Sequence, residues 1–203
     1  MSSQVVVLDP QKRERRRQIL EAAKHVFAEA GYHGASIHAI IDRADIARGT
    51  FYLYFESKSA VFSSILDEAM EQLRRHMHRI DVVTADAPPP QVQLRAQVIA
   101  ALEYVVKDRS LAMLLLSAGH TPDAEAAERL DQFFNEVRDL LRRAFESGQE
   151  IKLLRKVQPE LLAAAMLGMI RGVVEHIITD PDPPTVEAVV DEILLVALRG
   201  VLA

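Results

Sequence analysis

Apolar residues recur every three to four positions along almost the whole chain, the spacing that places them on one face of a helix. No segment alternates convincingly between apolar and polar residues, as a half-buried strand would. The pattern therefore predicts an all-α protein. We expect nine helices, at residues 11–30, 37–43, 47–55, 59–80, 92–107, 110–117, 124–147, 159–179 and 185–201.

Glycines, prolines and short polar residues mark the breaks between these helices. Gly31 stands where a C-terminal cap belongs, and Ser36 can cap the helix that follows. Three consecutive prolines within residues 81–90 exclude a helix there, because proline supplies no backbone donor. Thr121 is expected to cap the helix that begins at Ala124.

Charge divides the chain into two parts of opposite sign. The net charge of −5 argues against nucleic acid as a partner, but residues 12–58 carry nine Lys/Arg against six Asp/Glu. From residue 59 onward the count is 15 against 22. We therefore predict a disordered tail at 1–11, a basic head at 12–58 that meets a polyanion, and an acidic body at 59–203.

Two short helices joined by a turn, at 37–43 and 47–55, have the geometry of a DNA-binding helix-turn-helix. The second helix of such a unit enters the major groove. Arg48 can reach a phosphate or the acceptor edge of guanine, and Thr50 can bond a phosphate or touch a thymine methyl. Gly49 lets the backbone come close to the DNA.

Residues around this helix can add phosphate contacts. Tyr52 and Tyr54 offer hydroxyl groups, and Lys58 adds charge at a helix start that already favours a phosphate. The basic cluster Arg15–Arg17 is either a solvated helix end or an arm on the phosphates, and the sequence leaves both open. The predicted DNA-binding residues are Arg15, Arg16, Ser36, His38, Ala47, Arg48, Gly49, Thr50, Tyr52, Tyr54 and Lys58.

The head resembles the DNA-binding domain of the TetR family of bacterial regulators. The run GTFYLYF at 49–55, then Ser57-Lys58, and FAEAGY at 27–32 carry the match, which covers about residues 12–62. The remainder is similar only in helix pattern and in the segment from Gln158-Pro159-Glu160 to Gly172. The resemblance implies a homodimer on a palindromic operator, a small-molecule effector held in the body, and repression released by that effector.

Three positions of the head depart from the family pattern. Asp45 stands in the turn where glycine is usual, and aspartate tolerates the left-handed region better than most residues. Ala47 replaces the usual Ser or Thr cap of the recognition helix, which costs roughly 0.5–2 kcal/mol. Ile41 replaces a small residue. These changes affect the exact positions of the helices in the helix-turn-helix and do not change the predicted class of protein.

The helix at 159–179 is apolar on too many sides for one core alone, so we expect it to meet a partner subunit. Gly168 and Gly172 lie four apart on it. Their spacing is either accidental or the mark of a close helix seam, and we favour the seam. The predicted dimer residues are Gly168, Gly172, Val190 and Leu194.

The body is poor in aromatic residues, with four beyond Phe62. Aromatic cations prefer several aromatic faces, so we expect an aliphatic or acyl-like effector. The apolar stretches 111–116 and 163–170 favour a ligand site, although a plain core explains them too. The predicted ligand residues are Tyr104, Met113, Phe133, Val137, Met166 and Ile170, with Arg171, Glu175 and His176 as polar anchors.

Other classes of function find little support. The chain has no cysteine, no glycine-rich phosphate loop and no histidine cluster with metal-ligand spacing, so we expect no enzyme, cofactor or metal site. No run of 18 uninterrupted apolar residues predicts a membrane span, and a cytoplasmic location is expected. The alternative is a DNA-binding adaptor or architectural protein that takes no ligand.

Overall fold

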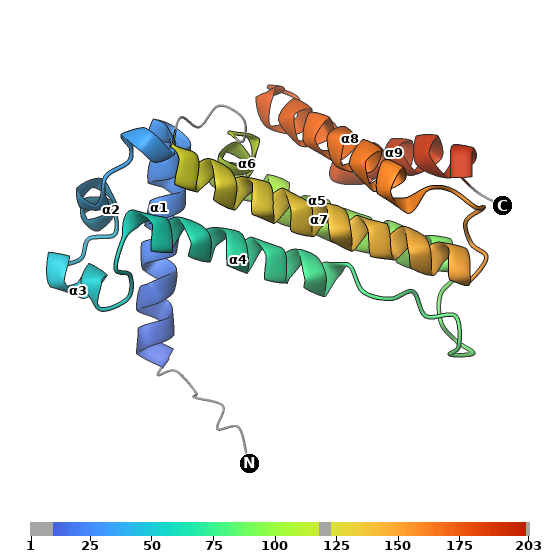
Figure 1. Cartoon of the computed structure of the whole chain (residues 1–203), viewed down its shortest axis with the longest axis horizontal. Coiled ribbons are helices and arrows are strands. Elements are labelled where there is room, and N and C mark those ends of the chain that lie inside the picture. Colours follow the sequence, from blue (N-terminus) through green and yellow to red (C-terminus); the bar gives the residue numbers. More distant parts are fainter. Residues whose placement is uncertain (1–9, 118–122, 202–203) are drawn as a thin grey trace, which may run out of the picture.

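The computed structural model describes residues 10–117 and 123–201. Within these ranges the chain is all-α, as predicted, with nine helices and no strand (Figure 1). The helices are α1 (Pro10–Gly34), α2 (Ile37–Arg43), α3 (Arg48–Tyr52), α4 (Lys58–His76), α5 (Pro90–Lys107), α6 (Arg109–Leu116), α7 (Ala124–Glu150), α8 (Pro159–Thr179) and α9 (Val186–Val201).

The head is built from α1 to α3, which gather at one end of the molecule (Figure 1). Helix α1 is interrupted at Gly31, whose φ of 66° lies in the region that glycine alone adopts freely. The Ser36 hydroxyl accepts a hydrogen bond from the Ala39 N–H and caps α2, as predicted. Helix α3 is shorter than the predicted 47–55, because Leu53 already closes it as a C-cap.

The turn between α2 and α3 depends on Asp45. Its φ of 49° is left-handed, in agreement with its place where the family has glycine. The Asp45 N–H donates to the Asp42 carbonyl at 3.2 Å, and the Ile46 N–H donates to the Ile41 carbonyl at 3.3 Å. No side chain caps α3 at Ala47, so the backbone of this turn alone sets the start of the recognition helix.

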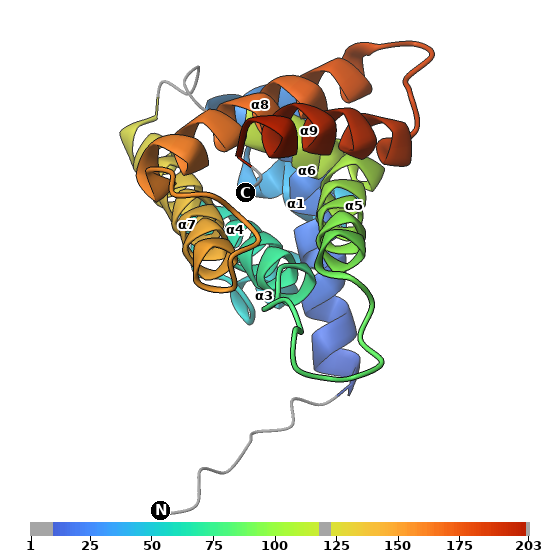
Figure 2. The same ribbon diagram turned by 90° about the vertical axis from the view of Figure 1, so that its right-hand side faces the viewer.

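The body is organised around the long pair α4 and α7, which lie side by side and point away from the head (Figure 1). Helix α5 packs beside α4, and α8 and α9 cross above the others (Figure 2). The short α6 lies between α1, α5 and α8, with Leu111, Ala112 and Leu114 fully or almost fully buried. One buried cluster runs without a break from Ile19 in the head to Phe133 in the body.

Some predicted boundaries move. Helix α4 ends at His76 rather than residue 80, because Met77 leaves the helical region at φ −99°, ψ 79°. Helix α7 is capped by Asp123, whose side chain accepts from the Ala126 N–H. The predicted cap Thr121, and residues 1–9 of the predicted tail, lie outside the described residues.

Helix α8 is long and apolar enough, by length and composition, to cross a membrane, with a mean hydropathy of 1.7 over its most apolar window. The helix contains no run of 18 uninterrupted apolar residues, because Arg171 and Glu175 interrupt it. In the structure α8 packs against α5, α6 and α7 as a helix of the body. Only 22% of the apolar window is buried, which leaves a broad face uncovered.

The left-handed turn predicts the effect of substitutions at Asp45. Asp45→Val should lower the free energy of unfolding by about 1–2 kcal/mol, since a β-branched residue is strained at positive φ. Asp45→Gly is the matched control and should keep or raise stability. Thermal and denaturant unfolding of both variants measure this. Equal stability of the valine variant and the wild type would contradict the role of the turn.

Candidate nucleic-acid interface and internal cavity

Helix α3 presents its polar side to solvent and anchors itself through one aromatic ring. Phe51 is completely buried, whereas Arg48 and Gly49 are exposed and Tyr52 is 45% exposed. The Arg48 guanidinium carbon lies 5.8 Å from the centre of the Tyr52 ring. A side chain at Gly49 would meet no protein atom within 4 Å. The chain thus has room for a Cβ at this position, and glycine there suits a close approach of the backbone to DNA.

Other predicted contacts fall around this helix in different settings. His38 is exposed on α2, with its Nδ1 3.5 Å from Asp42, and Ala47 is exposed at the start of α3. Thr50 and Tyr54 are half-buried. The sequence interpretation missed Leu53, which is 82% exposed at the end of α3. An apolar side chain so placed is suited to a thymine methyl.

Lys58 has a different position from the one expected. Its ammonium donates to the carbonyls of Tyr32 at 2.7 Å and Ala35 at 3.1 Å. It also lies 4.2 Å from the centre of the Tyr32 ring. These bonds close α1 against α4, and the phosphate contact of Lys58 stays a prediction.

The basic residues of α1 divide in the same way. Arg16 forms an ion pair with Glu68 on α4, and its guanidinium carbon lies 5.4 Å from the centre of the Phe55 ring. Arg15 is exposed and bonds only along its own helix, to Gln18 at 2.6 Å. Arg15 is thus placed to reach a polyanion, whereas Arg16 secures the head to α4.

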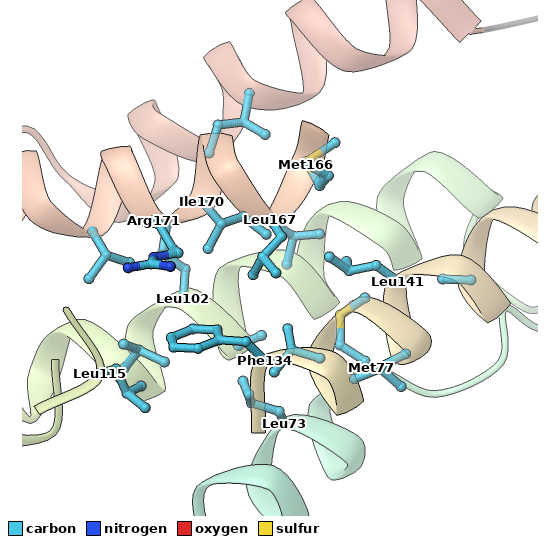
Figure 3. Close-up of a pocket in the computed structure, with 18 of the residues that line it drawn as sticks. Leu73, Met77, Leu102, Leu115, Phe134, Leu141, Met166, Leu167, Ile170 and Arg171 are labelled. Carbon is cyan, nitrogen blue, oxygen red and sulfur yellow. The ribbon is translucent and has the colours of Figure 1, made fainter. Parts of the chain in front are cut away.

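The body contains a cavity of about 170 Å³ whose lining comes from every helix from α4 to α9 (Figure 3). This exceeds the ~150 Å³ apolar cavity that is known to bind benzene. Its wall is formed by leucine, valine, isoleucine, methionine and phenylalanine side chains, among them Leu102, Phe134, Leu141 and Met166. Arg171 is the one charged residue in the lining, with its guanidinium carbon 4.7 Å from the centre of the Phe134 ring.

Five of the predicted ligand residues are brought together in this wall. They are Phe133, Val137, Met166, Ile170 and Arg171.

The other four predicted ligand residues do not line this cavity, and their part in ligand binding stays a prediction. Met113 is 41% exposed, because α6 turns its neighbours inward instead. Glu175 and His176 are exposed on α8 and are absent from the cavity lining. Tyr104 packs toward the head–body core, and burial raises the pKa of its phenol.

A second cavity of about 380 Å³ adjoins the first at the end of the body far from the head. The two share lining residues, including Met77, Leu94 and Phe145. Gln97 on α5 lines the second cavity and is 5% exposed, and its Nε2 has no hydrogen-bond partner among the described residues. Burying an amide without a partner costs about 1–3 kcal/mol. Sequence periodicity could not reveal this residue, because a glutamine on an amphipathic helix is normally solvated.

The outer face of α8 carries small and polar side chains. Ala164, Ala165, Gly168 and Gly172 are all exposed on it. Val190 is completely buried within its own chain, so its prediction as a dimer residue is corrected. Leu194 lines the first cavity and is half-buried.

Head and body meet where α1 packs against α6. Lys24 forms ion pairs with Asp108, at the start of α6, and with Glu21 at 2.7 Å. Ser110 Oγ and His25 Nδ1 are 2.8 Å apart in a hydrogen bond. Burial acts to lower the pKa of Lys24, but the bonds to Asp108 and Glu21 outweigh it and raise this pKa above its ordinary value.

The part of the chain that the structure describes contains no candidate metal site. No group of three or more His, Asp or Glu side chains comes together there as a possible ligand set.

Two family profiles match the chain and together cover most of it. Residues 19–65 match the bacterial regulatory proteins of the tetR family, and residues 87–201 match the tetracyclin repressor-like C-terminal domain. The second match alone covers more than half of the sequence. The chain therefore belongs to the TetR family of transcriptional regulators, as the resemblance of its head predicted.

Relatives with known names are regulators. The HTH-type transcriptional repressor KstR of Mycobacterium tuberculosis is 31% identical over 138 residues, which cover 68% of this chain and 61% of KstR. The fatty acid metabolism regulator protein of Bacillus subtilis is 25% identical over 156 residues, or 72% of this chain and 79% of that protein. This chain thus spans less than two thirds of the length of KstR.

Solved structures share the fold. The regulator FadR from Bacillus subtilis, in complex with stearoyl-CoA, has a TM-score of 0.74 at 22% identity. The superposition covers 91% of this chain and 98% of FadR.

The position of Lys58 makes a prediction about stability. Lys58→Met should lower the free energy of unfolding by about 1–3 kcal/mol, because two carbonyls lose a charged donor. Lys12→Met, at an exposed position of α1, is the matched control and should leave stability unchanged. If Lys58→Met unfolds like the wild type but lowers the salt dependence of DNA binding, the phosphate role is correct after all.

Proposed function

We propose that this protein is a transcriptional repressor that binds a palindromic operator as a homodimer and is released by a small aliphatic effector. Its site of action is the cytoplasm, where the operator lies. The observation that carries the proposal is the double role of α6. Leu115 and Leu116 line the internal cavity, while the same helix packs against α1 of the head. A molecule in the cavity therefore touches the helix that supports the DNA-binding unit.

The chemistry of the cavity supports an aliphatic effector. Its wall offers methyl and methylene groups, and two of its three rings, Phe133 and Phe134, are engaged edge-to-face with each other. Such a wall favours a flexible hydrocarbon chain over a planar cation. The names of the relatives point the same way, since one is a fatty acid metabolism regulator and one structure contains stearoyl-CoA.

DNA release tests this proposal most directly. A duplex that the protein selects from a random pool serves as the operator, and fluorescence anisotropy measures its affinity. Dodecanoate or dodecanoyl-CoA should weaken binding by about tenfold or more, which is within the usual range of allosteric coupling. The planar cation rhodamine 6G, titrated against protein alone, is the control. Tight dye binding with no response to aliphatic compounds would contradict the effector class, and a response to neither would favour the adaptor alternative.

The exposed face of α8 supports the dimer. Its exposed strip begins with Leu161, which is 66% exposed, and continues through small residues, a surface that a second helix can cover. Ala164, Ala165, Gly168 and Gly172 let a second helix come close along this face. A second copy of the chain meets the same face in a two-fold arrangement, which presents two heads to two half-sites.

Gly172→Trp tests the dimer without disturbing the fold. A Cβ built at Gly172 meets no atom within 4 Å and the residue is exposed, so a tryptophan there is expected to extend into solvent and obstruct a partner. Sedimentation at micromolar concentration should show monomers with unchanged helical content and greatly weakened operator binding. Val83→Trp, at a 90% exposed loop residue, is the control and should stay dimeric. A monomeric wild type would overturn the proposal.

Arg48 and Arg15 are expected to play different parts on the DNA. Arg48→Ala should relax the preferred sequence at one position in each half-site, because a good base contact is worth about 1–3 kcal/mol. Arg15→Ala should weaken all sequences alike and lower the slope of log K against log salt by about one per half-site. Selection from random DNA and a salt series measure both. An unchanged preference for Arg48→Ala would assign base reading to other residues.

A further inference from the structure

The first cavity explains how a hydrocarbon chain is held, but it offers little to a polar group. Arg171 is its one charged lining residue, and its guanidinium already stacks on Phe134. An aliphatic effector with a polar end needs somewhere for that end to go. The adjoining second cavity is lined by polar and charged side chains as well as apolar ones.

Gln97 gives the second cavity a defined hydrogen-bonding requirement. It is 95% buried, since its exposed fraction is 5%, and its Nε2 has no acceptor in the part of the chain that the structure describes. Leu94, one helical turn before it on α5, lines both cavities. An amide so placed is satisfied by an oxygen atom at the boundary between the apolar and polar spaces.

The charges around the second cavity favour an anion. Arg79 and Arg143 line it together with His78, against the single carboxylate of Glu150. Arg143 is 3.3 Å from Asp139, a weak pairing in an exposed position. Arg79 follows the end of α4 and takes part in no ion pair among the described residues. The second cavity that Gln97 lines therefore carries a net positive charge from its arginines.

We propose that the second cavity binds the polar head of the same effector: an acyl oxygen accepts a hydrogen bond from Gln97, and negative charge at or beyond it faces Arg79 and Arg143. The effector is then an anionic acyl compound with its chain in the first cavity. This inference rests on the proposed function. A free fatty acid and an acyl thioester of a phosphate-bearing carrier share this chemistry, and they differ in how far the charge lies from the acyl oxygen.

Calorimetric titration of the full-length protein, without DNA, tests the head site. Four probes share one chain length: dodecanoate, dodecanoyl-CoA, dodecanol and dodecyltrimethylammonium. At least one acyl anion should bind about tenfold more tightly than the alcohol and the cation, as expected for a charge-assisted hydrogen bond. Which of the two anions prevails identifies the source of the acyl group.

Variants assign the preference to residues. Gln97→Met should weaken the preferred acyl anion by about tenfold and leave dodecanol within about twofold, since it removes a hydrogen bond and keeps the volume. The protein without ligand should unfold at the same or a higher temperature, because an unpaired buried amide is lost. Arg79→Gln should weaken the anion in a way that fades with salt. Gln132→Met and Arg138→Gln, exposed on α7 and outside both cavities, are the matched controls.

The outcomes separate the two proposals. If all four probes bind alike and release DNA, and neither Gln97→Met nor Arg79→Gln changes this, the aliphatic effector stands and the head site is wrong. If the acyl anion binds through Gln97 but leaves operator binding unchanged, the head site stands and effector-controlled release is wrong. If no aliphatic probe binds, both are wrong.

Discussion

Lys24 on α1 and Asp108 at the start of α6 form an ion pair that lies largely out of water, with 14% and 28% of their side chains exposed. Asp108 serves two helices at once, because its other oxygen accepts the Leu111 N–H and caps α6. Removing Lys24 leaves Asp108 without its cationic partner in a largely buried position, which destabilises the contact between α1 and α6. The hydrogen bond between His25 and Ser110 and the buried face of α6 complete it. The head is thereby fixed to the helix that also forms one wall of the cavity.

The arrangement places the DNA-binding surface and the cavity on opposite sides of one packed cluster. A closely packed core does not deform smoothly, so a chain that fills the cavity and shifts α6 carries α1 with it. In a two-fold dimer such a shift changes the spacing of the two recognition helices, and binding to both half-sites then costs free energy. The effector needs no contact with the head. It needs only to bind one arrangement of α6 better than the other.

The sequence predicted most of the fold, because apolar periodicity reports directly which helix faces are buried. It also placed the recognition helix and the left-handed Asp45, since both depend on local residues. It failed where the partner comes from elsewhere in the chain. Lys58 donates to the carbonyls of Tyr32 and Ala35, and the amide of Gln97 is buried where α4 packs against α5. The sequence also could not separate Arg171, which lines the cavity, from the exposed Glu175, because a helix apolar nearly all round does not show which side its body covers.

The most direct test of this account measures how strongly effector binding in the cavity changes operator affinity when the ion pair between Lys24 and Asp108 is removed. Lys24→Met with Asp108→Asn removes the ion pair, keeps a capping oxygen for α6 and leaves no buried charge. Arg95→Met with Asp191→Asn, which removes an ion pair between α5 and α9 with a distance of 2.6 Å, is the matched control. The quantity measured is the ratio of operator affinities without and with a saturating aliphatic effector. The account predicts that this ratio falls toward one in the Lys24→Met, Asp108→Asn variant and is unchanged in the control. The full wild-type ratio in the Lys24→Met, Asp108→Asn variant, which still binds the operator and the effector, would contradict the account.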